Sequence, residues 1–377
     1  MTVNVTFHGA CGTVTGSCFE VRNQDGAVLI DCGMFQGTKS VKALNYEPFR
    51  FASSAVNALV LTHAHIDHCG LMPRLTKAGF RNPIYCSAPT ADLISYVLPD
   101  SGYIQEIEVE RLNLRNRQRG LRPVEPIYTR SDAEHSLAQV KPVGLGSWTA
   151  IAPGMAMRLW DAGHILGSVS VELKVAPSAQ KDAETMTVLF SGDIGPAGVD
   201  YLVVESTYGD RVRAAVTNGE RRAKLGREIS AGLSRGGVIL IPAFAVERTQ
   251  ELLHDLTRLM AERALPETQI FVDSPLATRA TAIFDKYING GIGSERVRFV
   301  QDGNESRNLN RISAGAIILA GSGMCDAGRI RHHLKARLHL PSTTVLLVGY
   351  QAPGTLGSLL QAGRAMVRIQ GEEIAVA

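Results

Sequence analysis

The chain has 377 residues, 45% of them hydrophobic and 20% charged, which is enough for two domains with substantial cores. No stretch is long and apolar enough to span a membrane, and no secretory signal precedes the first predicted strand, so we expect a cytoplasmic protein. The formal net charge of +3 is too small to indicate a nucleic-acid partner by itself.

Six cysteines are present, and none of them shows Cys-x-x-Cys spacing. An intracellular chain of this size does not need disulfides. We therefore predict buried thiols at positions 11, 18, 32, 69, 86 and 325.

The N-terminal part of the chain is predicted to form short strands separated by turns. One strand is predicted over residues 3–8, and the apolar run 28–30 ends in Asp31. A carboxylate at a strand end can hold a ligating imidazole or a metal-bound water in place. It can equally cap a turn, and both interpretations stay open.

The segment His63-Ala64-His65-Ile66-Asp67-His68 follows the apolar run 58–62. Imidazole and carboxylate are ligands that zinc accepts, and three histidines and one aspartate in six residues cannot all reach one tetrahedral ion. The spacing therefore predicts two metal ions at the end of a buried strand. A purification tag or a surface tract is the alternative, but tags carry no interleaved aspartate and do not follow a strand.

Arginine and lysine are concentrated in the segments 110–122 and 329–337. Basic segments of this kind bind polyanions, but they are also common on solvated helix faces. The sequence leaves both interpretations open for the first segment. In the second, His332 and His333 are interpreted as surface residues of a helix.

Two further candidate ligands lie beside a glycine where apolar strands begin or end. His164 precedes a predicted strand over 169–175, so its imidazole is expected at a turn between strands. Asp193 follows the run 188–192, and a carboxylate at that position can bridge two ions. A lone histidine is often a hydrogen-bonded core residue, but the cluster at 63–68 favours the ligand interpretation for His164.

The organisation of the chain changes near Glu205, where alternating strands are replaced by four units of apolar strand, small-residue loop and helix. Strands that are buried on both faces and separated by helices indicate a parallel, doubly wound sheet. The loops at the carboxyl ends of such strands collect ligands. The four strands are predicted at 238–241, 270–272, 316–320 and 345–348.

These strand-end loops contain candidate substrate contacts. Ser274 lies in the second loop, and Ser322 and Gly323 lie in a loop that we expect to open a helix whose N–H groups cradle a phosphate. Arg248 and Arg329 begin predicted helices and are candidate phosphate clamps. Arginines at helix starts are also common as plain surface residues, so that alternative stays open.

The quoted residues resemble a known family. Asp31, the 63–68 cluster, His164 and Asp193 are similar, in order, to the first four motifs of the metallo-β-lactamase fold. The segment 203–210, Val-Val-Glu-Ser-Thr-Tyr-Gly-Asp, resembles the first motif of the β-CASP branch, which includes pre-mRNA 3′-end cleavage enzymes and bacterial RNA-degrading enzymes. The resemblance extends over nearly the whole chain through the segments 242–250, 273–275, 321–324 and 349–355.

The resemblance implies an α/β fold, namely a metallo-β-lactamase αββα sandwich with an inserted Rossmann-like β-CASP domain that contains a parallel sheet. The implied boundaries are 1–205 for the first domain, 206–365 for the inserted domain and 366–377 for a segment returning toward the first domain. In the family the first domain then resumes with a Ser-Ala-His-like and a His-Gly-Glu-like motif. We therefore expect its C-terminal portion to be missing from this chain. The connection 195–199 is also shorter than the usual loop of the family.

The resemblance further implies a ribonuclease that holds two zinc ions and takes RNA as its partner. A hydroxide shared by the two ions would attack the phosphodiester in a cleft between the domains. His63, His65 and His164 would hold one ion, Asp67 and His68 the other, and Asp193 would bridge them. Catalytic roles are expected for Asp31, Asp67 and Glu205, and substrate contacts for Arg248, Ser274, Ser322, Gly323 and Arg329.

Two other functions compete with this expectation. A small-molecule metallo-hydrolase of the same fold is disfavoured, because such enzymes do not need the second half that begins near Glu205. An inactive RNA-binding subunit is disfavoured because it would typically have lost metal ligands, and all six are present here. No membrane partner is expected, and a homodimer stays open.

Overall fold

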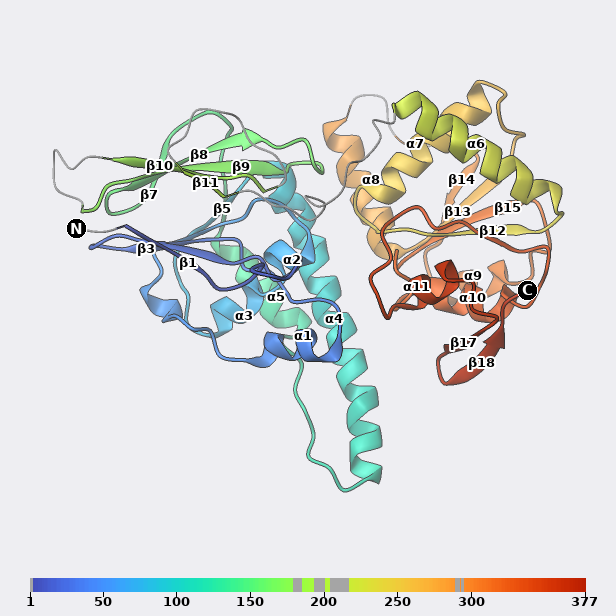
Figure 1. Cartoon of the computed structure of the whole chain (residues 1–377), viewed down its shortest axis with the longest axis horizontal. Coiled ribbons are helices and arrows are strands. Elements are labelled where there is room, and N and C mark those ends of the chain that lie inside the picture. Colours follow the sequence, from blue (N-terminus) through green and yellow to red (C-terminus); the bar gives the residue numbers. More distant parts are fainter. Residues whose placement is uncertain (1–2, 179–184, 193–200, 204–216, 289–291, 293–294) are drawn as a thin grey trace. The chain divides into compact units, whose positions relative to one another are not determined.

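The computed structural model describes residues 3–178, 185–192, 201–203, 217–288, 292 and 295–377. The chain forms two compact units that divide between Arg211 and Val212 (Figure 1). The domain boundary predicted after Glu205 falls outside the described residues. Each unit has its own sheets and its own hydrophobic core.

The first unit contains two sheets. One has the strand order β1-β2-β3-β4-β5-β6, antiparallel from β1 to β3 and parallel from β3 to β6. The other has the order β11-β10-β9-β8-β7, antiparallel except for the pair β10 and β11. The first sheet consists of β1 (Asn4–Phe7), β2 (Phe19–Arg22), β3 (Ala27–Ile30), β4 (Ala58–Val60), β5 (Ile84–Cys86) and β6 (Val140–Pro142). The second consists of β7 (Thr149–Ala152), β8 (Met155–Asp161), β9 (Val169–Val175), β10 (Met186–Phe190) and β11 (Tyr201–Val203).

The core of the first unit lies between these two sheets. Ile30 and Val60 of the first sheet belong to the same buried cluster as Leu159 and Val171 of the second. Strand β8 alternates between buried and partly exposed residues, as expected for a sheet with one face on the core. Strands β3 and β4 are buried at every position because helices cover their other face (Figure 1). This is the sandwich that the family resemblance implies.

The helices of the first unit are short, with one exception. They are α1 (Lys39–Ala43), α2 (Ile66–Cys69), α3 (Met72–Lys77), α4 (Ala88–Gln118) and α5 (Arg130–Ser136), together with the 3-10 turns η1 (Leu44–Tyr46), η2 (Ser53–Ala55) and η3 (Leu137–Gln139). Helix α4 begins after Ser87, whose Oγ accepts a hydrogen bond from the N–H of Thr90 at 3.3 Å. Pro89 lies in its first turn, where a proline costs no helical hydrogen bond.

The second unit contains one five-stranded sheet in the order β14-β13-β15-β12-β16, with every neighbouring pair parallel. Its strands are β12 (Val238–Pro242), β13 (Gln269–Asp273), β14 (Val297–Phe299), β15 (Ala316–Ala320) and β16 (Thr344–Val345). Its helices are α6 (Asn218–Ser234), α7 (Arg248–Ala261), α8 (Pro275–Tyr287), α9 (Gly303–Leu309), α10 (Ile330–Arg337) and α11 (Leu356–Gln361). Helices α6 to α8 lie on one face of the sheet and α9 to α11 on the other, which confirms the doubly wound prediction (Figure 1).

All four predicted strand-and-helix units are present, but the outer strands differ from the prediction. The strand expected at 345–348 is reduced to Thr344–Val345, because only these two residues pair with β12. Strand β14 was not predicted. It has three residues at the edge of the sheet, none of them fully buried, and so lacks the apolar run of a central strand.

Residues 366–377, expected as a segment returning toward the first domain, contain a hairpin of β17 (Met366–Ile369) and β18 (Glu372–Ala375). Val367 and Ile369 are buried in the core cluster of the second unit. The N–H of Ala377 donates to the carbonyl oxygen of Leu338 at 3.0 Å. This segment therefore packs on the second unit.

Five of the six predicted buried thiols are buried, and Cys11 is exposed. Burial raises the pKa of the Cys86 thiol to about 12 and raises that of Cys69 well above its ordinary value. No helix among the described residues has the length and apolar character needed to cross a membrane.

Candidate metal centre

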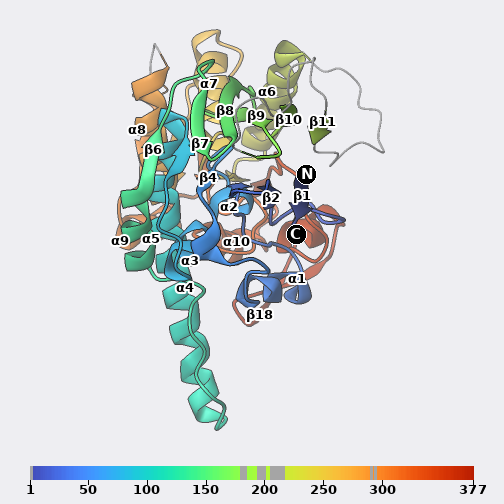
Figure 2. The ribbon, with the colours of Figure 1, turned by 90° about the vertical axis from the view of Figure 1, so that its left-hand side faces the viewer.

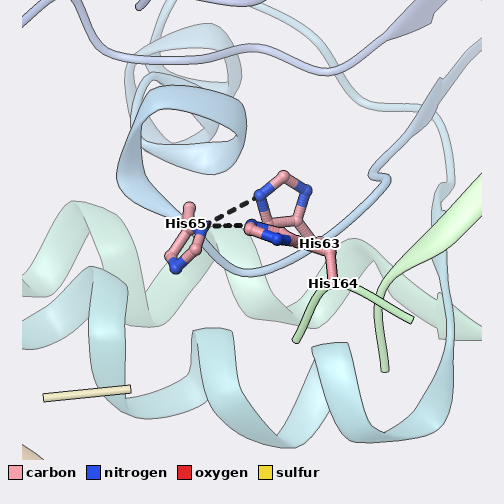
Figure 3. Close-up of side chains that lie close together, drawn as sticks. All are labelled: His63, His65 and His164. Carbon is pink, nitrogen blue, oxygen red and sulfur yellow. Dashed lines mark hydrogen bonds between the residues drawn. The ribbon is translucent and has the colours of Figure 1, made fainter. Parts of the chain in front are cut away.

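Three imidazoles converge at one end of the sandwich. His63 follows β4, His65 precedes α2, and His164 lies in the loop between β8 and β9. The Nε2 of His63 is 3.0 Å from the Nδ1 of His65, and the Nε2 of His164 is 3.2 Å from the same atom. One ring nitrogen from each residue lies within 4.8 Å of those of the other two, and Figure 3 shows the three rings turned toward one another. These are the three histidines that the family resemblance implies as ligands of one ion.

Backbone hydrogen bonds place the His164 loop beside the end of β4. The N–H of Val169 donates to the carbonyl oxygen of Thr62 at 2.8 Å. Within the loop, the Oγ of Ser168 accepts the N–H of His164 at 2.9 Å. The hydroxyls of Ser87 and Thr90 both donate to the carbonyl oxygen of Gly167, at 2.5 and 2.9 Å. The His164 loop is thus attached both to the sheet and to the start of α4.

The environment of the three histidines suits a cation. His63 is buried, His65 is partly buried and His164 is exposed, so the cluster opens toward solvent. Burial lowers the pKa of the His63 imidazole well below its ordinary value, and the imidazoles of His68, His65 and His164 lower it further. His63 is therefore neutral at physiological pH, which is the form that binds a metal. The donor set fits a borderline divalent ion such as zinc.

Asp31 connects this cluster to α2. Its carboxylate is buried and accepts the backbone N–H and the hydroxyl of Thr62, both at 2.8 Å. The same carboxylate lies 2.8 Å from the Nδ1 of His68. With Nδ1 engaged in this way, a metal bond from His68 has to use Nε2. Asp31 itself adopts a φ of +59°, a left-handed conformation that aspartate tolerates better than most residues.

Asp67 and His68 lie on α2, but they do not join the three-histidine group. Among the described residues, His63, His65 and His164 form the one group whose ligand atoms lie this close together. Two predicted site residues, Asp193 and Glu205, lie outside the described residues. Gly192, which precedes Asp193, is described. A Cβ placed on it would lie 2.9 Å from the carbonyl oxygen of Val169 and 3.4 Å from the Cβ of Thr62, beside the metal centre.

Gly33 has a role in the site that was not predicted from the sequence. A Cβ built on Gly33 would lie 1.6 Å from the carbonyl oxygen of Asp67 and 2.9 Å from the backbone nitrogen of His68. Hydrogen bonds hold the two segments at this distance, because the N–H of Cys32 donates to the carbonyl oxygen of His68 at 2.8 Å. The glycine directly after Asp31-Cys32 was the available signal, since glycine permits close backbone approach.

The predicted substrate-contacting residues of the second unit lie at one edge of its sheet. Ser274 follows β13, and its Oγ accepts the N–H of Ala277 at the start of α8. Ser322 follows β15, and its Oγ accepts the N–H of Ala327 at 3.2 Å. A Cβ on Gly323 would lie 2.8 Å from the ring of Phe244 in the loop after β12. The three loops are therefore neighbours, as expected for parallel strands.

One detail of that prediction is wrong. The loop containing Ser322 and Gly323 does not open a helix, because residues 321–329 form turns and α10 begins at Ile330. The loop that runs directly into a helix is the one containing Ser274, which caps the N-terminus of α8. A Gly-Ser-Gly sequence favours turns as well as helix starts, and here the turns prevail.

The two predicted phosphate clamps already have carboxylate partners. Arg248 lies 2.7 Å from Glu251 on the next turn of α7. Arg329 lies 2.6 Å from Asp273, which is fully buried at the end of β13. Arg329 is therefore paired with a buried carboxylate of the second unit, while part of its own side chain stays exposed.

Asp273 is the centre of a buried polar cluster that the sequence analysis missed. Its carboxylate accepts the hydroxyl of Ser306 at 2.6 Å and lies 2.6 Å from the Nε2 of His333. The interpretation of His333 as a surface residue is wrong, since its side chain is fully buried. The signal was its position four residues after Arg329, which places both side chains on one face of a helix.

Burial opposes ionisation of Asp273, but the hydrogen bonds from His333, Ser306 and Arg329 outweigh it and lower the pKa of this carboxyl. The ionised form is therefore the one that stabilises the fold. Its contribution to stability is fully present above the ordinary pKa of an aspartate and is lost as the pH falls through the lower pKa of the folded state.

Comparison with known proteins identifies the family. Residues 11–130 match the Metallo-beta-lactamase superfamily, and residues 249–360 match the Beta-Casp domain. The chain is 33% identical over 392 residues to the protein named Ribonuclease TTHA0252 from Thermus thermophilus, over 97% of this chain and 83% of that protein. The chain belongs to the metallo-β-lactamase family, in its β-CASP branch. This is a family of nuclease hydrolases, which confirms the enzyme class and the fold class predicted from the sequence.

Two other proteins are similar to this β-CASP chain. The transcription termination factor FttA from Methanosarcina mazei is 29% identical over 400 residues, which cover 98% of this chain and 59% of that protein. A protein of unknown function from Enterococcus faecalis has a crystal structure that matches 85% of this chain and 77% of its own, with a TM-score of 0.51 and 10% identity. The latter likeness concerns the fold alone.

The contact at Gly33 generates a first prediction for this β-CASP protein. We expect Gly33→Ala to push α2 away from the Asp31 segment, because the added methyl group meets backbone atoms that cannot rotate aside. Thermal unfolding in the presence of a chelator should show a loss of about 1–3 kcal/mol in the free energy of unfolding. Gly144→Ala is the matched control, since nothing lies within 4 Å of a Cβ at that position. Equal unfolding midpoints for the two variants would contradict the contact.

A second prediction concerns Asp273. We expect Asp273→Asn to lower the free energy of unfolding by about 3 kcal/mol or more, because it leaves a buried ion pair without one partner. The difference between wild type and variant should shrink as the pH falls below about 4, where the Asp273 carboxyl of the unfolded wild type begins to take up its proton while that of the folded state, with its lowered pKa, is still ionised. Denaturant titrations from pH 7 to pH 3 measure both effects. The exposed pair of Arg258 and Glu262 supplies the control Glu262→Gln, which should leave the midpoint unchanged at every pH.

Proposed function

We propose that this chain is a zinc-dependent ribonuclease that hydrolyses RNA phosphodiester bonds with two bound zinc ions. The observation that carries the proposal is the preformed three-histidine cluster, in which a buried and neutral His63 meets two more exposed imidazoles. The choice of RNA is supported by the 33% identity to the Thermus thermophilus protein named as a ribonuclease. A cytoplasmic location and a homodimer stay predictions.

In this proposal His63, His65 and His164 bind the first ion, and Asp67 and His68 bind the second. Asp193 would be a ligand common to both, an assignment supported by the position of the preceding Gly192 beside Thr62. When bound, the two ions would supply Lewis acidity, which favours deprotonation of water near neutral pH and neutralises charge on the phosphoryl oxygens.

The chain's own groups position these ligands. Asp31 fixes the ring of His68 through Nδ1 and is itself held by Thr62, so the imidazole cannot rotate without breaking several hydrogen bonds. Asp67 supplies a carboxylate oxygen that can accept a proton from the attacking water. A catalytic role is proposed for Glu205 from its motif alone.

We assign the RNA backbone contacts to the strand-end loops of the second unit, so that the substrate contacts both units. Ser274, Ser322 and Gly323 are neighbours at one sheet edge, and Arg248 and Arg329 flank the same loops. Both arginines have carboxylate partners within the chain, so each would offer its remaining N–H groups to a phosphate.

A third prediction tests the metal. Elemental analysis of the purified chain should find up to two zinc ions, and His164→Ala should reduce the content because it removes an imidazole of the three-histidine group. His332→Ala removes an exposed histidine of the second unit and should leave the zinc content unchanged. Absence of zinc from the wild type, before and after reconstitution, would refute the metal assignment.

A fourth prediction tests the chemistry. Asp67→Ala should lower the rate of RNA cleavage at least about 100-fold, because it removes both a ligand and a proton acceptor, while the thermal midpoint stays close to that of the wild type. The assay uses 5′-labelled RNA and DNA of equal sequence, together with a small ester. Cleavage of the ester but not of RNA would favour a small-molecule hydrolase. RNA binding without cleavage by the wild type would favour an inactive subunit.

A further inference from the structure

Helix α4 extends beyond the core of its unit. All of its buried residues lie between Thr90 and Gly102, and no residue from 103 to 118 is buried. Figures 1 and 2 show this part of the helix projecting from the rest of the unit in two views. At 1.5 Å per residue the projection is about 24 Å long. We call residues 103–127, the projecting helix and the segment that returns along it, the basic arm.

The basic arm is held together by specific hydrogen bonds. The side-chain amide of Asn113 donates to the carbonyl oxygen of Val124 at 2.9 Å and accepts its N–H at 2.8 Å. The helix ends at Gln118, Gly120 follows with a φ of +67°, and the N–H of Leu121 donates back to the carbonyl oxygen of Asn116 at 2.9 Å. The returning segment is therefore fixed against the helix, and the arm presents its side chains at defined positions.

The charges along the arm are separated. Acidic residues lie at its base, where Glu106, Glu108 and Glu110 precede the first arginine. No aspartate or glutamate occurs from 111 to 124. Five arginines lie in this acid-free stretch, all exposed and none with an ion pair among the described residues: Arg111, Arg115, Arg117, Arg119 and Arg122.

This arrangement has an energetic cost that the fold offsets only in part. Arg115 lies four residues from Arg111 and four from Arg119, and like charges at that spacing destabilise a helix by about 0.2–0.5 kcal/mol per pair. The helix macrodipole favours cations in the last turn, which accounts for Arg115 and Arg117 but for neither Arg111 nor Arg122. The cluster is therefore best explained by an external anion.

We propose that the basic arm binds the phosphate backbone of the RNA substrate at a distance from the metal centre. The inference rests on the proposed ribonuclease function. Guanidinium groups match the geometry of phosphate oxygens, and a row of exposed arginines without acidic partners is complementary to a polyanion. Leu112, Leu114 and Leu121 are also exposed on the arm, so a second copy of this chain is the competing partner. Two arms meeting at their tips would, however, bring ten arginines together without a carboxylate.

Helix α4 also sets the distance between the arm and the metal centre. Its first turn holds the His164 loop through Ser87 and Thr90. Arg117 lies near its other end, about 40 Å away at 1.5 Å per residue. An RNA that contacts both places must span this distance. The arm is therefore expected to assist long substrates and to have no effect on very short ones.

The test measures binding of a single-stranded RNA of about 30 nucleotides to the full chain over a series of salt concentrations, with chelator present to prevent cleavage. The variant Arg115→Gln/Arg117→Gln/Arg119→Gln should bind about tenfold or more weakly, and the slope of log affinity against log salt should decrease by about 2, since each lost contact to a single strand removes about 0.7. Arginine-to-lysine changes at the same three positions should restore most of the slope.

The control variant removes the same number of positive charges from another part of the chain. Arg263→Gln/Arg311→Gln/Arg364→Gln alters three exposed arginines of the second unit that have no ion pair among the described residues. It should leave the slope close to that of the wild type. An equal loss in both triple variants would overturn the proposal, because the effect would then come from total charge.

Cleavage assays separate this inference from the function on which it rests. The arm variant should raise KM for the long RNA several-fold and leave cleavage of an RNA of about five nucleotides unchanged. A wild type that cleaves neither RNA would refute the proposed function. A wild type that cleaves both, with an arm variant that binds like the wild type, would refute the arm proposal alone. If Leu112→Ser/Leu121→Ser converts a dimer to a monomer while the arginine variant binds RNA normally, the arm is a dimer contact and the proposal is wrong.

Discussion

The carboxylate of Asp31 is the constraint on which the metal centre depends. It accepts the N–H and the hydroxyl of Thr62 and lies against the Nδ1 of His68, so one buried group ties β3, the end of β4 and α2 together. A buried carboxylate without these partners would be strongly unfavourable. With them, several hydrogen bonds to one group hold Thr62 and His68 in fixed positions. The left-handed conformation of Asp31 and the backbone contact at Gly33 are both consequences of bringing the strand end this close to α2.

The second unit also has a buried carboxylate at a strand end that binds a histidine. Asp273 also closes a buried strand, and it also binds a histidine, a hydroxyl and a further donor. There the histidine is His333 in the interior of the unit, whereas in the first unit it is His68 near the cluster of imidazoles. In each case a carboxylate at a strand end holds in place a helix from another part of the chain, through the histidine on that helix. This fixes the loops at one edge of each sheet.

The sequence predicts those features that depend on residues close together in the chain. The cluster from His63 to His68 spans six residues and follows a buried strand, and the central strands of both units are apolar runs that no turn residue interrupts. The position of His164 could be predicted because the sequence indicates a turn before an alternating strand at that point. The same reasoning reached the parallel order of the second unit, since four strand-and-helix repeats leave few alternatives.

The features that escaped prediction are long-range pairings. His333 and Asp273 are sixty positions apart. The spacing from Arg329 places His333 on the same helix face as that arginine, but nothing local shows that this face meets Asp273. Gly33 has to be a glycine because of the carbonyl oxygen of Asp67, which only the folded chain brings near. The loop containing Ser322 was misplaced relative to its helix because glycine and serine are compatible with turns and with helix starts alike. The register of a strand and the rotation of a helix about its axis depend on the segments that pack against them. A single sequence does not show which segments these are.

The burial of five cysteines bears on which metal the chain can select. Cys69 directly follows His68, yet its Sγ lies 3.5 Å from the carbonyl oxygen of Ala64, and burial keeps its pKa well above the ordinary value. Thiolate is the form that competes for soft ions, and in this interior the thiol keeps its proton. The ligand group at this site consists of the three imidazoles of His63, His65 and His164. Nitrogen donors of this kind suit a borderline divalent ion better than copper(I), which prefers sulfur.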